Sequence, residues 1–286
     1  MLTEDILRLS TAVEELLVAQ NPRGMARLRP QLNPGYCARA AQNLWEHRNK
    51  NILIGTGFPV SNTFETDGPA GAMALYEALQ SLGANVWLAG PPSLAAVLAP
   101  THQVLALHAA HASEQQRHCD ESLARIKPDL ILAIEVPGAA ADGNYYNIRG
   151  IDISAQCGNF ESFMKTQGCA TIGIGDGGNE AGMGNIDALA ADLPIKQAVG
   201  HCDELVIADV SNWGAYALVG FLGHWAKRPF LQDLRQRPLL EWLTQHGAVD
   251  GVTHKMTATE DGLTLGSGNR LIDALINIFM TNKGAQ

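Results

Sequence analysis

The chain has 286 residues, of which 46% are hydrophobic and 17% are charged. This composition provides enough apolar surface for a large core and excludes an intrinsically disordered chain. Lys and Arg number 20 against 29 Asp and Glu, which gives a formal net charge of −9. An acidic chain is a poor ligand for polyanions, so we expect neither nucleic acid nor a membrane surface as a partner.

The cysteines and the N-terminus indicate the compartment. The five cysteines are scattered and form no Cys-x-x-Cys pair, so we expect neither a disulfide framework nor a structural zinc site. Residues 1–17 carry acidic side chains within an apolar helical pattern, unlike a signal or transit peptide. No apolar run reaches the roughly 18 residues of a transmembrane helix. We therefore expect a cytoplasmic protein.

Helical and strand patterns follow one another along most of the chain. Residues 3–19 and 35–49 space their apolar side chains as helices do, with three prolines between them. Short apolar runs then alternate with helical patterns, as is typical of strands that are buried on both faces. The predicted strands are residues 51–57, 85–90, 103–108, 130–136, 171–176 and 204–209. The later predicted helices are residues 66–83, 92–99, 113–127, 159–168, 186–200, 211–227, 235–246 and 268–282.

This alternation predicts an α/β fold, in which a mostly parallel sheet carries helices on both faces as a Rossmann-like three-layer sandwich. Ligand sites of such sheets lie in the loops beyond the carboxyl ends of the strands. We expect residues 1–286 to form a single catalytic domain, with residues 1–34 as a helical extension packed on it. Residues 247–267 predict a small flap or hairpin.

The loop of residues 55–72, GTGFPVSNTFETDGPAGA, follows the first predicted strand. Thr66 or Asp67 is a favourable N-cap, and Pro69 fits the first turn of the next helix. Amides at a helix N-terminus can also bind a ligand carboxylate. The alternative is that Asp67 only caps the helix. Glu65 has no capping role at its spacing, which makes it a candidate for binding.

The loop of residues 135–152 crowds acidic, amide and aromatic side chains together. Glu135 ends a predicted strand. Arg149 is a natural partner for a ligand carboxylate, because the planar guanidinium matches two carboxylate oxygens. The alternative for Arg149 is a surface salt bridge to Asp152.

The loop of residues 173–185, GIGDGGNEAGMGN, formally matches the dinucleotide pattern G-x-G-x-x-G. Asp176 and Glu180 stand where a pyrophosphate would need amides, so we expect no nucleotide cofactor. No Lys or Arg occurs in residues 166–195. A bound cation would neutralise these carboxylates, and oxygen-rich sets of this kind suit Mg²⁺ or Mn²⁺. A substrate ammonium, or basic residues distant in the sequence, are the alternatives.

The loop of residues 208–216, ADVSNWGAY, follows the last predicted strand. Ser211 or Asn212 can cap the next helix, whose first amides would then face the same edge of the sheet. Trp213 is more typical of a core. Among the histidines, His254 in the predicted flap is the one that we retain as a candidate base.

Taken together, these loops resemble the D-glutamate cyclase family, over about residues 40 to 282. The resemblance is to the domain at the C-terminal end of the animal mitochondrial enzyme, and the chain looks like its stand-alone form. It implies a lyase that reversibly cyclises D-glutamate to 5-oxo-D-proline with loss of water. The matching motifs are TGFPV (56–60), ETDGPAGA (65–72), ADGNYYNIRGIDIS (141–154), TIGIGDGGNEAGMGN (171–185), SNWGAY (211–216) and VDGVT (249–253).

The chemistry of this reaction leads to a hypothesis for the site. The partner would be a small-molecule substrate, and a homo-oligomer is left open. Catalytic roles are assigned to Asp176, Glu180 and Asp142. A divalent metal, Mn²⁺ or Mg²⁺, would be held by Glu135, Asp176 and Glu180. Substrate binding is assigned to Thr56, Gly57, Glu65, Asp67, Gly68, Asn144, Tyr145, Arg149, Gly178, Asn179, Ser211 and Asn212.

Two other classes of function stay open. One is another metal-dependent lyase or amidohydrolase that acts on a small amino or carboxylic acid. The other is a non-catalytic protein that binds an amino acid or a nucleotide. Ligand-induced thermal stabilisation without product would favour the second class.

Overall fold

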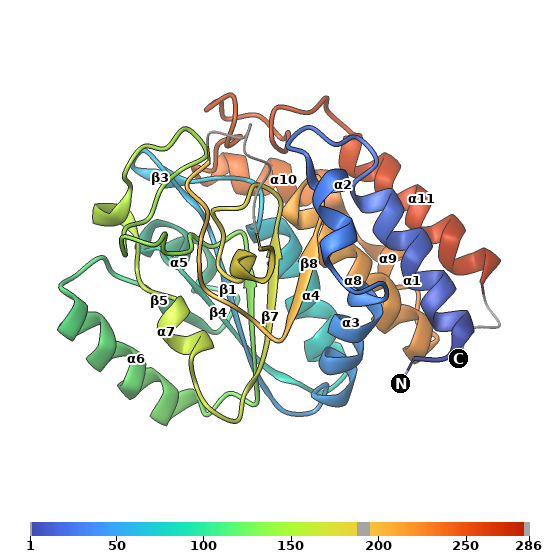
Figure 1. Ribbon diagram of the computed structural model, residues 1–286, viewed down its shortest axis with the longest axis horizontal. Helices are drawn as coiled ribbons and strands as arrows, with labels where there is room; N and C mark the ends of the chain where they lie inside the picture. The colour runs from blue at the N-terminus through green and yellow to red at the C-terminus, as the bar shows by residue number, and fades with distance from the viewer. Residues whose placement is uncertain (1, 188–194, 283–286) are drawn as a thin grey trace.

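A computed structural model of the chain, which describes residues 2–187 and 195–282, contains a central parallel sheet (Figure 1). The order of the strands is β5-β4-β1-β6-β7-β8, and every pairing is parallel. All six predicted strands are confirmed. The strands are β1 (Asn51–Thr56), β4 (Asn85–Gly90), β5 (Val104–Ala106), β6 (Leu130–Ile134), β7 (Ala170–Gly175) and β8 (Glu204–Ile207), with a short antiparallel pair β2 (Pro59–Val60) and β3 (Thr63–Phe64).

Helices cover both faces of this sheet. The helix expected over residues 186–200 differs: residues 188–194 lie outside the described residues, and residues 195–200 contain no helix. None of the described helices is long and apolar enough to cross a membrane. The helices are α1 (Glu4–Leu17), α2 (Met25–Leu28), α3 (Tyr36–Glu46), α4 (Pro69–Ser81), α5 (Pro92–Leu98), α6 (Ala112–Ile126), α7 (Glu161–Met164), α8 (Ser211–Ala226), α9 (Phe230–Asp233), α10 (Gln236–Gln245) and α11 (Ser267–Thr281).

The alternation of side chains along the strands produces the layers. Ile52 and Ile54 of β1 join the larger core cluster, which includes residues of α3, α4 and α8. Leu53 points to the other face and joins a cluster with residues of α6 and α7. Because successive side chains of a strand point to opposite faces, a continuous apolar run can fill both cores. The predicted three-layer α/β fold is confirmed.

The order of the strands changes direction between β1 and β6, in the middle of the sheet. From β1 the chain proceeds first to β4 and β5 on one side, and later to β6, β7 and β8 on the other. At such a switch point the loops beyond the strand ends diverge, and ligands bind between them. The loops after β1, β6, β7 and β8 are the four singled out in the sequence.

The N-terminal segment is bound to the sheet. Helix α1 packs against α3, α8 and α11 (Figure 1). Beyond it, the Asp209 carboxylate at the end of β8 accepts hydrogen bonds from the backbone amides of Gln20 (2.7 Å) and Asn21 (3.0 Å). The turn after α1 therefore lies at the carboxyl edge of the sheet.

Residues 247–267 form an irregular loop of turns and contain no hairpin. The reason is Asp250, whose carboxylate accepts hydrogen bonds from the backbone amides of Thr253 (2.8 Å) and Gly262 (2.9 Å) and from the Thr259 hydroxyl (2.7 Å). These hydrogen bonds outweigh burial and lower the pKa of Asp250. One carboxylate therefore holds the turns of this segment together, and Val249 at its start forms an isolated parallel bridge with Glu65.

Candidate functional site

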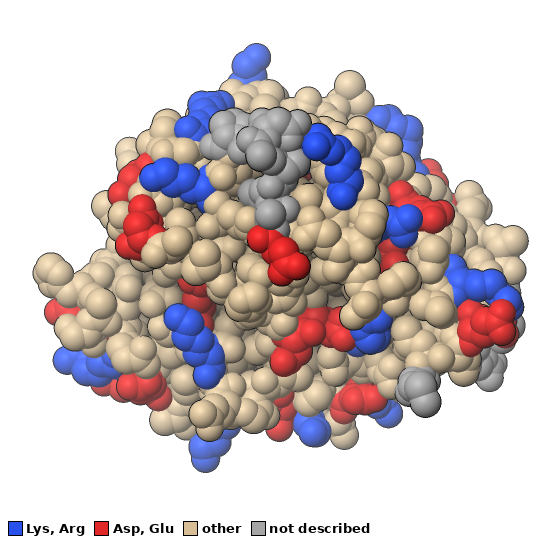
Figure 2. All heavy atoms as spheres, viewed as in Figure 1, with Lys and Arg blue, Asp and Glu red and all other residues tan. Residues whose placement is uncertain are grey.

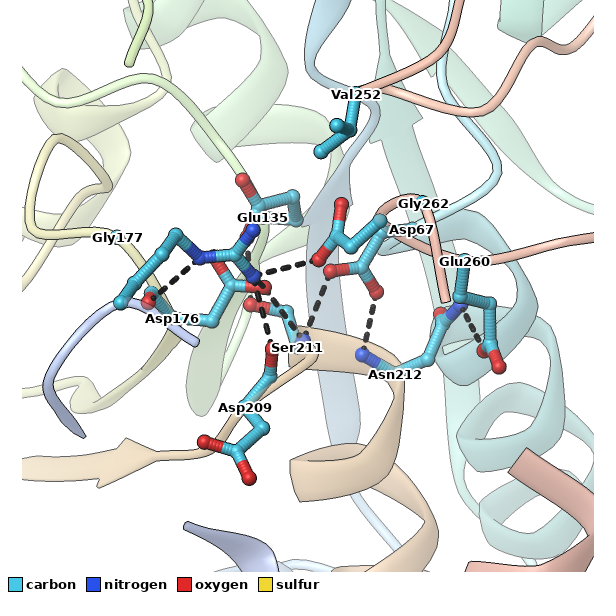
Figure 3. Close-up of polar contacts among 12 residues, drawn as sticks. Asp67, Glu135, Asp176, Gly177, Asp209, Ser211, Asn212, Val252, Glu260 and Gly262 are labelled. Carbon is cyan, nitrogen blue, oxygen red and sulfur yellow. Dashed lines mark hydrogen bonds and ion pairs between the residues drawn. The ribbon is translucent and has the colours of Figure 1, made fainter. Parts of the chain in front are cut away.

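Three carboxylates from three loops meet at the switch point (Figure 3). Asp67 follows β3, Glu135 follows β6 and Asp176 follows β7. One oxygen of each lies within 4.8 Å of the other two, and all three side chains are buried. We call Asp67, Glu135 and Asp176 the acidic triad. Two of its members belong to the predicted metal set, and Asp67 stands where Glu180 was expected.

The N-terminus of α8 points at the triad (Figure 3). Asp67 accepts hydrogen bonds from the amides of Ser211 (2.8 Å) and Asn212 (2.7 Å), and Asp176 accepts a longer one from Ser211 (3.2 Å). The Ser211 hydroxyl donates to Glu135 (2.5 Å). The unpaired amides and the dipole of a helix N-terminus stabilise negative charge, so this geometry holds the carboxylates in place.

Both helix-cap predictions are wrong in the same way. Gly68 occupies the N-cap of α4 and Val210 that of α8, and neither helix has a side-chain cap within its own loop. Asp67 instead serves α8, a helix that begins 144 residues later in the chain. An Asp accepts from whichever helix N-terminus packing brings to it, and local spacing does not contain that information.

The carboxylate oxygens of the triad are suitable ligands for a divalent cation. Among the described residues, the hydrogen bonds donated to Glu135 and Asp176 fall on Oε2 and Oδ2 respectively. The second oxygen of each carboxylate can therefore face a cation. Carboxylate oxygens are the ligands preferred by Mg²⁺ and Mn²⁺.

Burial makes full ionisation of these acids costly. Removal from water raises the pKa of Asp67, Glu135 and Asp176 well above the usual range, and repulsion from neighbouring carboxyl groups raises it further. The same causes act on Glu65. Buried like charges cannot all persist without protons or cations. The triad is therefore a place that favours a positively charged ligand.

Arg23 supplies the nearby protein cation, which sequence reasoning missed. It lies in the turn after α1, its side chain is 12% exposed, and Nη2 lies 2.5 Å from Asp176 Oδ2 and 2.6 Å from Asp261 Oδ2. The absence of Lys and Arg from residues 166–195 was the available signal, since it required a neutralising group from elsewhere. Nothing local marks Arg23 as that group.

Glu65 and Glu180 lie beside the triad. Among the described residues no group donates a hydrogen bond to the Glu65 carboxylate. This carboxylate packs closely against the backbone of Gly251, because a Cβ added to Gly251 would lie 1.8 Å from Glu65 Oε2. Glu180 uses both oxygens to accept from the amides of Gly177 (2.9 Å) and Gly178 (2.7 Å) of its own loop. Burial raises its pKa in spite of these amides.

A small cavity adjoins the ends of β1, β4 and β6. Its volume is about 20 Å³, and Thr56, Gly57 and Val136 are among its lining residues. The Thr56 hydroxyl is buried and has no hydrogen-bond partner among the described residues. Such a cavity holds about one water.

The polar loop of residues 141–154 lies at the rim. Asp142 is exposed and accepts from the Tyr146 hydroxyl (2.6 Å), the main cause of its lowered pKa. It also accepts from the amide of Asn144 (3.0 Å). Arg149 is exposed and donates to the carbonyl of Val252 (3.3 Å). The structure therefore places these predicted residues outside the triad, where the loop contacts residues 247–267.

The remaining predicted residues lie at several different positions. Tyr145 is buried in a small cluster with Phe58, apart from the triad. Asn179 is buried and donates to the Tyr146 carbonyl (2.9 Å), which joins the loop after β7 to the rim loop. Gly68 and Gly178 donate their amides to Asp67 and Glu180. His254, the candidate base, is exposed in the irregular segment.

A second, larger hollow lies elsewhere. It measures about 870 Å³, and its lining residues come from α1, α3, α8, α9 and α11, among them Trp45, Trp225 and Phe279. No carboxylate belongs to its described lining, so this hollow lies apart from the acidic triad. On the face in Figure 2, Lys and Arg alternate with Asp and Glu, as on an ordinary solvated surface.

Comparison with known proteins identifies the family. The family model described as "D-glutamate cyclase-like, C-terminal" matches residues 13–276. The chain belongs to this D-glutamate cyclase-like family. The human protein named "D-glutamate cyclase, mitochondrial" is 33% identical over 205 residues, which span 59% of this chain and 32% of the human protein. The chain therefore matches about a third of the length of that relative.

Two solved structures are similar to the chain at low identity. One is an exopolyphosphatase-related protein from Bacteroides fragilis, 13% identical, with a TM-score of 0.39 over 89% of this chain and 58% of that chain. The other is RecJ in complex with Mn²⁺ from Thermus thermophilus, 15% identical, with a TM-score of 0.39 over 97% of this chain and 43% of that chain.

Glu260 binds the first residues of α8. It is buried, and its carboxylate accepts hydrogen bonds from the side chains of Asn212 (2.9 Å), Trp213 (3.3 Å) and Gln236 (2.9 Å). Burial raises the pKa of Glu260 to about 7, although these hydrogen bonds oppose the shift. The network links α8 and α10 to the irregular segment.

This raised pKa predicts a pH dependence of stability. In the unfolded chain Glu260 titrates near 4.5, so between that pH and about 7 the folded state binds the extra proton. Its stabilising contribution is full below pH 4.5 and is lost as the pH rises through about 7. We expect the unfolding free energy of the wild type, relative to Glu260→Gln, to fall by about 3 kcal/mol over this range. Urea unfolding of both proteins at several pH values measures this difference, and a constant difference would contradict it.

Proposed function

We propose that the protein interconverts D-glutamate with 5-oxo-D-proline and water. The observation that carries the proposal is the buried triad under the N-terminus of α8, in a chain of the D-glutamate cyclase-like family. The printed name of the human relative points to the same reaction. The substrate has one ammonium and two carboxylates, so a site with excess negative charge and helix amides suits it.

The reaction needs proton transfer and an activated carboxylate. The nitrogen of D-glutamate forms a bond to its own γ-carboxyl carbon, and one γ-oxygen leaves. Two of the three ammonium protons depart with that oxygen as water, and one stays on the ring nitrogen. A positioned base and acid, and a group that makes the carboxylate electrophilic, lower the barrier.

The residues present can be assigned to these tasks. Asp67, Glu135 and Asp176 would hold a divalent cation, which when bound supplies the Lewis acidity for the γ-carboxylate. Glu65 would accept a proton from the ammonium, because no donor among the described residues competes for its carboxylate. Glu180 would hold the ammonium from the other side.

The other substrate contacts follow the cavity and the rim. The Thr56 hydroxyl, buried without a partner, would hydrogen-bond the substrate beside Gly57. Arg149 and Asn144, on the rim loop, would bind the α-carboxylate of the substrate. Asp142 would orient this loop by accepting a hydrogen bond from Tyr146. Ser211 and Asn212 would act indirectly, because their backbone amides hold carboxylates of the triad in place.

Chiral chromatography tests the proposal directly. Purified protein is incubated separately with D-glutamate, L-glutamate and 5-oxo-D-proline, with added Mn²⁺ or with EDTA. We expect interconversion of the D-pair alone, lost in EDTA and restored by Mn²⁺. Turnover that survives EDTA would keep the cyclase and contradict the metal. Absence of any conversion would leave a protein that binds or transforms another small acid.

The compartment is a further part of the proposal. All five cysteines are free thiols. Disulfides are rare where the surroundings keep thiols reduced, which supports the cytoplasm.

A further inference from the structure

Arg23 joins three segments that are far apart in the sequence. Its Nε donates to the carbonyl of Asp176 at the end of β7 (3.1 Å), and Nη2 donates to the carbonyl of Asp209 at the end of β8 (2.9 Å). Nη2 also contacts the carboxylates of Asp176 (2.5 Å) and Asp261 (2.6 Å). One buried guanidinium therefore links the turn after α1, the sheet edge and the irregular segment.

Hydrogen bonds to Asp209 hold the turn that carries Arg23. Asp209 accepts from the amides of Gln20 and Asn21, and its own amide donates to the carbonyl of Leu17 (2.8 Å). The Asn21 side chain in turn accepts from the amide of Ala26 (3.0 Å). Hydrogen bonds on both sides of Arg23 thus set its direction before any ligand arrives, as a positioned group requires.

Residues 247–267, the irregular segment, contact Arg23 through Asp261. Glu260 anchors it to Asn212, Trp213 and Gln236, and the next residue, Asp261, faces the guanidinium. The same segment covers Glu65 with the backbone of Gly251. The Arg23–Asp261 ion pair therefore holds residues 247–267 close to Glu65 and the acidic triad.

We propose that Arg23 is a positioning residue for the cyclisation, an inference that rests on the proposed function. Its guanidinium holds Asp176 through Oδ2 and the backbone carbonyl, and so fixes the position of this triad carboxylate. Through Asp261 it holds residues 247–267 over the site. Attraction from Asp176 and Asp261 outweighs burial and raises the pKa of Arg23 well above its usual value. Lys cannot reproduce this role, because its ammonium lacks the planar fork.

The test compares Arg23→Ala and Arg23→Lys with Arg39→Ala. Arg39 is a matched control, because it also binds one carboxylate, Glu204 (2.7 Å), and two carbonyls, but it lies on α3 away from the triad. We expect Arg23→Ala to lower kcat and Mn²⁺ affinity by about 10- to 100-fold each. We expect Arg23→Lys to recover little and Arg39→Ala to keep wild-type turnover. Methylguanidinium added to Arg23→Ala should restore part of kcat.

Hydrogen exchange separates this inference from the proposed function. We expect amides of residues 247–267 to exchange faster in Arg23→Ala than in the wild type and in Arg39→Ala. If the wild type does not turn over D-glutamate, the proposed function fails, and exchange and Mn²⁺ titration decide the role of Arg23. Wild-type exchange in residues 247–267 together with wild-type Mn²⁺ affinity in Arg23→Ala would overturn it. Wild-type kcat in an Arg23→Ala protein that remains folded would also overturn it.

Discussion

Glu135→Gln is expected to lower kcat for D-glutamate cyclisation by about 10³-fold while leaving the metal-free protein as stable as the wild type or more stable. The activity falls because one charged ligand of the triad is lost, which weakens cation binding and the stabilisation of charge in the transition state. Stability does not fall, because burial and repulsion raise the pKa of Glu135, so its ionised form opposes folding at neutral pH.

Steady-state kinetics and thermal unfolding in EDTA measure both effects of Glu135→Gln. Glu161→Gln is the control, since Glu161 is also a buried acid with a pKa raised by burial, but it accepts from the Ala139 amide outside the triad. The control should retain wild-type turnover. A Glu135→Gln protein with undiminished kcat would remove Glu135 from the mechanism.

Asp67→Ala is expected to abolish activity and also to destabilise the protein by about 2–4 kcal/mol, unlike Glu135→Gln. Asp67 accepts hydrogen bonds from three buried amides, those of Gly68, Ser211 and Asn212. Alanine leaves these donors unsatisfied in the interior and removes the acceptor at the N-terminus of α8, costs that exceed the relief of repulsion.

The predicted loss for Asp67→Ala corresponds to a fall in Tm of roughly 3–7 °C. Asp67→Asn is the matched variant: it keeps an acceptor oxygen for two of the amides, so it should recover part of the Tm but not the activity. Calorimetry of both variants in EDTA measures the difference. A Tm of Asp67→Ala at or above the wild-type value would mean that repulsion, and not amide capping, dominates at this residue.

These two variants distinguish two tasks within one cluster. Within the described part of the chain Glu135 receives one hydrogen bond, from the Ser211 hydroxyl, which leaves its other oxygen for a ligand. Asp67 is both a structural acceptor and a triad member. Opposite changes in stability with a common loss of activity would therefore support the geometry of the triad more strongly than either variant alone.

The sequence by itself determined the layered fold and the edge on which the site lies. Most of the strands are apolar runs buried on both faces, which is typical of a parallel sheet covered by helices. Glu135 and Asp176 directly follow strands in the chain. Because the carboxyl ends of parallel strands share one edge, their meeting was predictable without a structure.

The tertiary structure alone decided the partners of these acids. Asp67 has the local spacing of a cap for α4, yet it serves α8, because packing at the switch point brings those amides closer. Arg23 and Asp176 are 153 residues apart, and no periodicity records their contact. Residues 247–267 lack a regular backbone pattern because Asp250 satisfies several of their donors. Local sequence sets which groups can pair, and long-range packing selects which of them do.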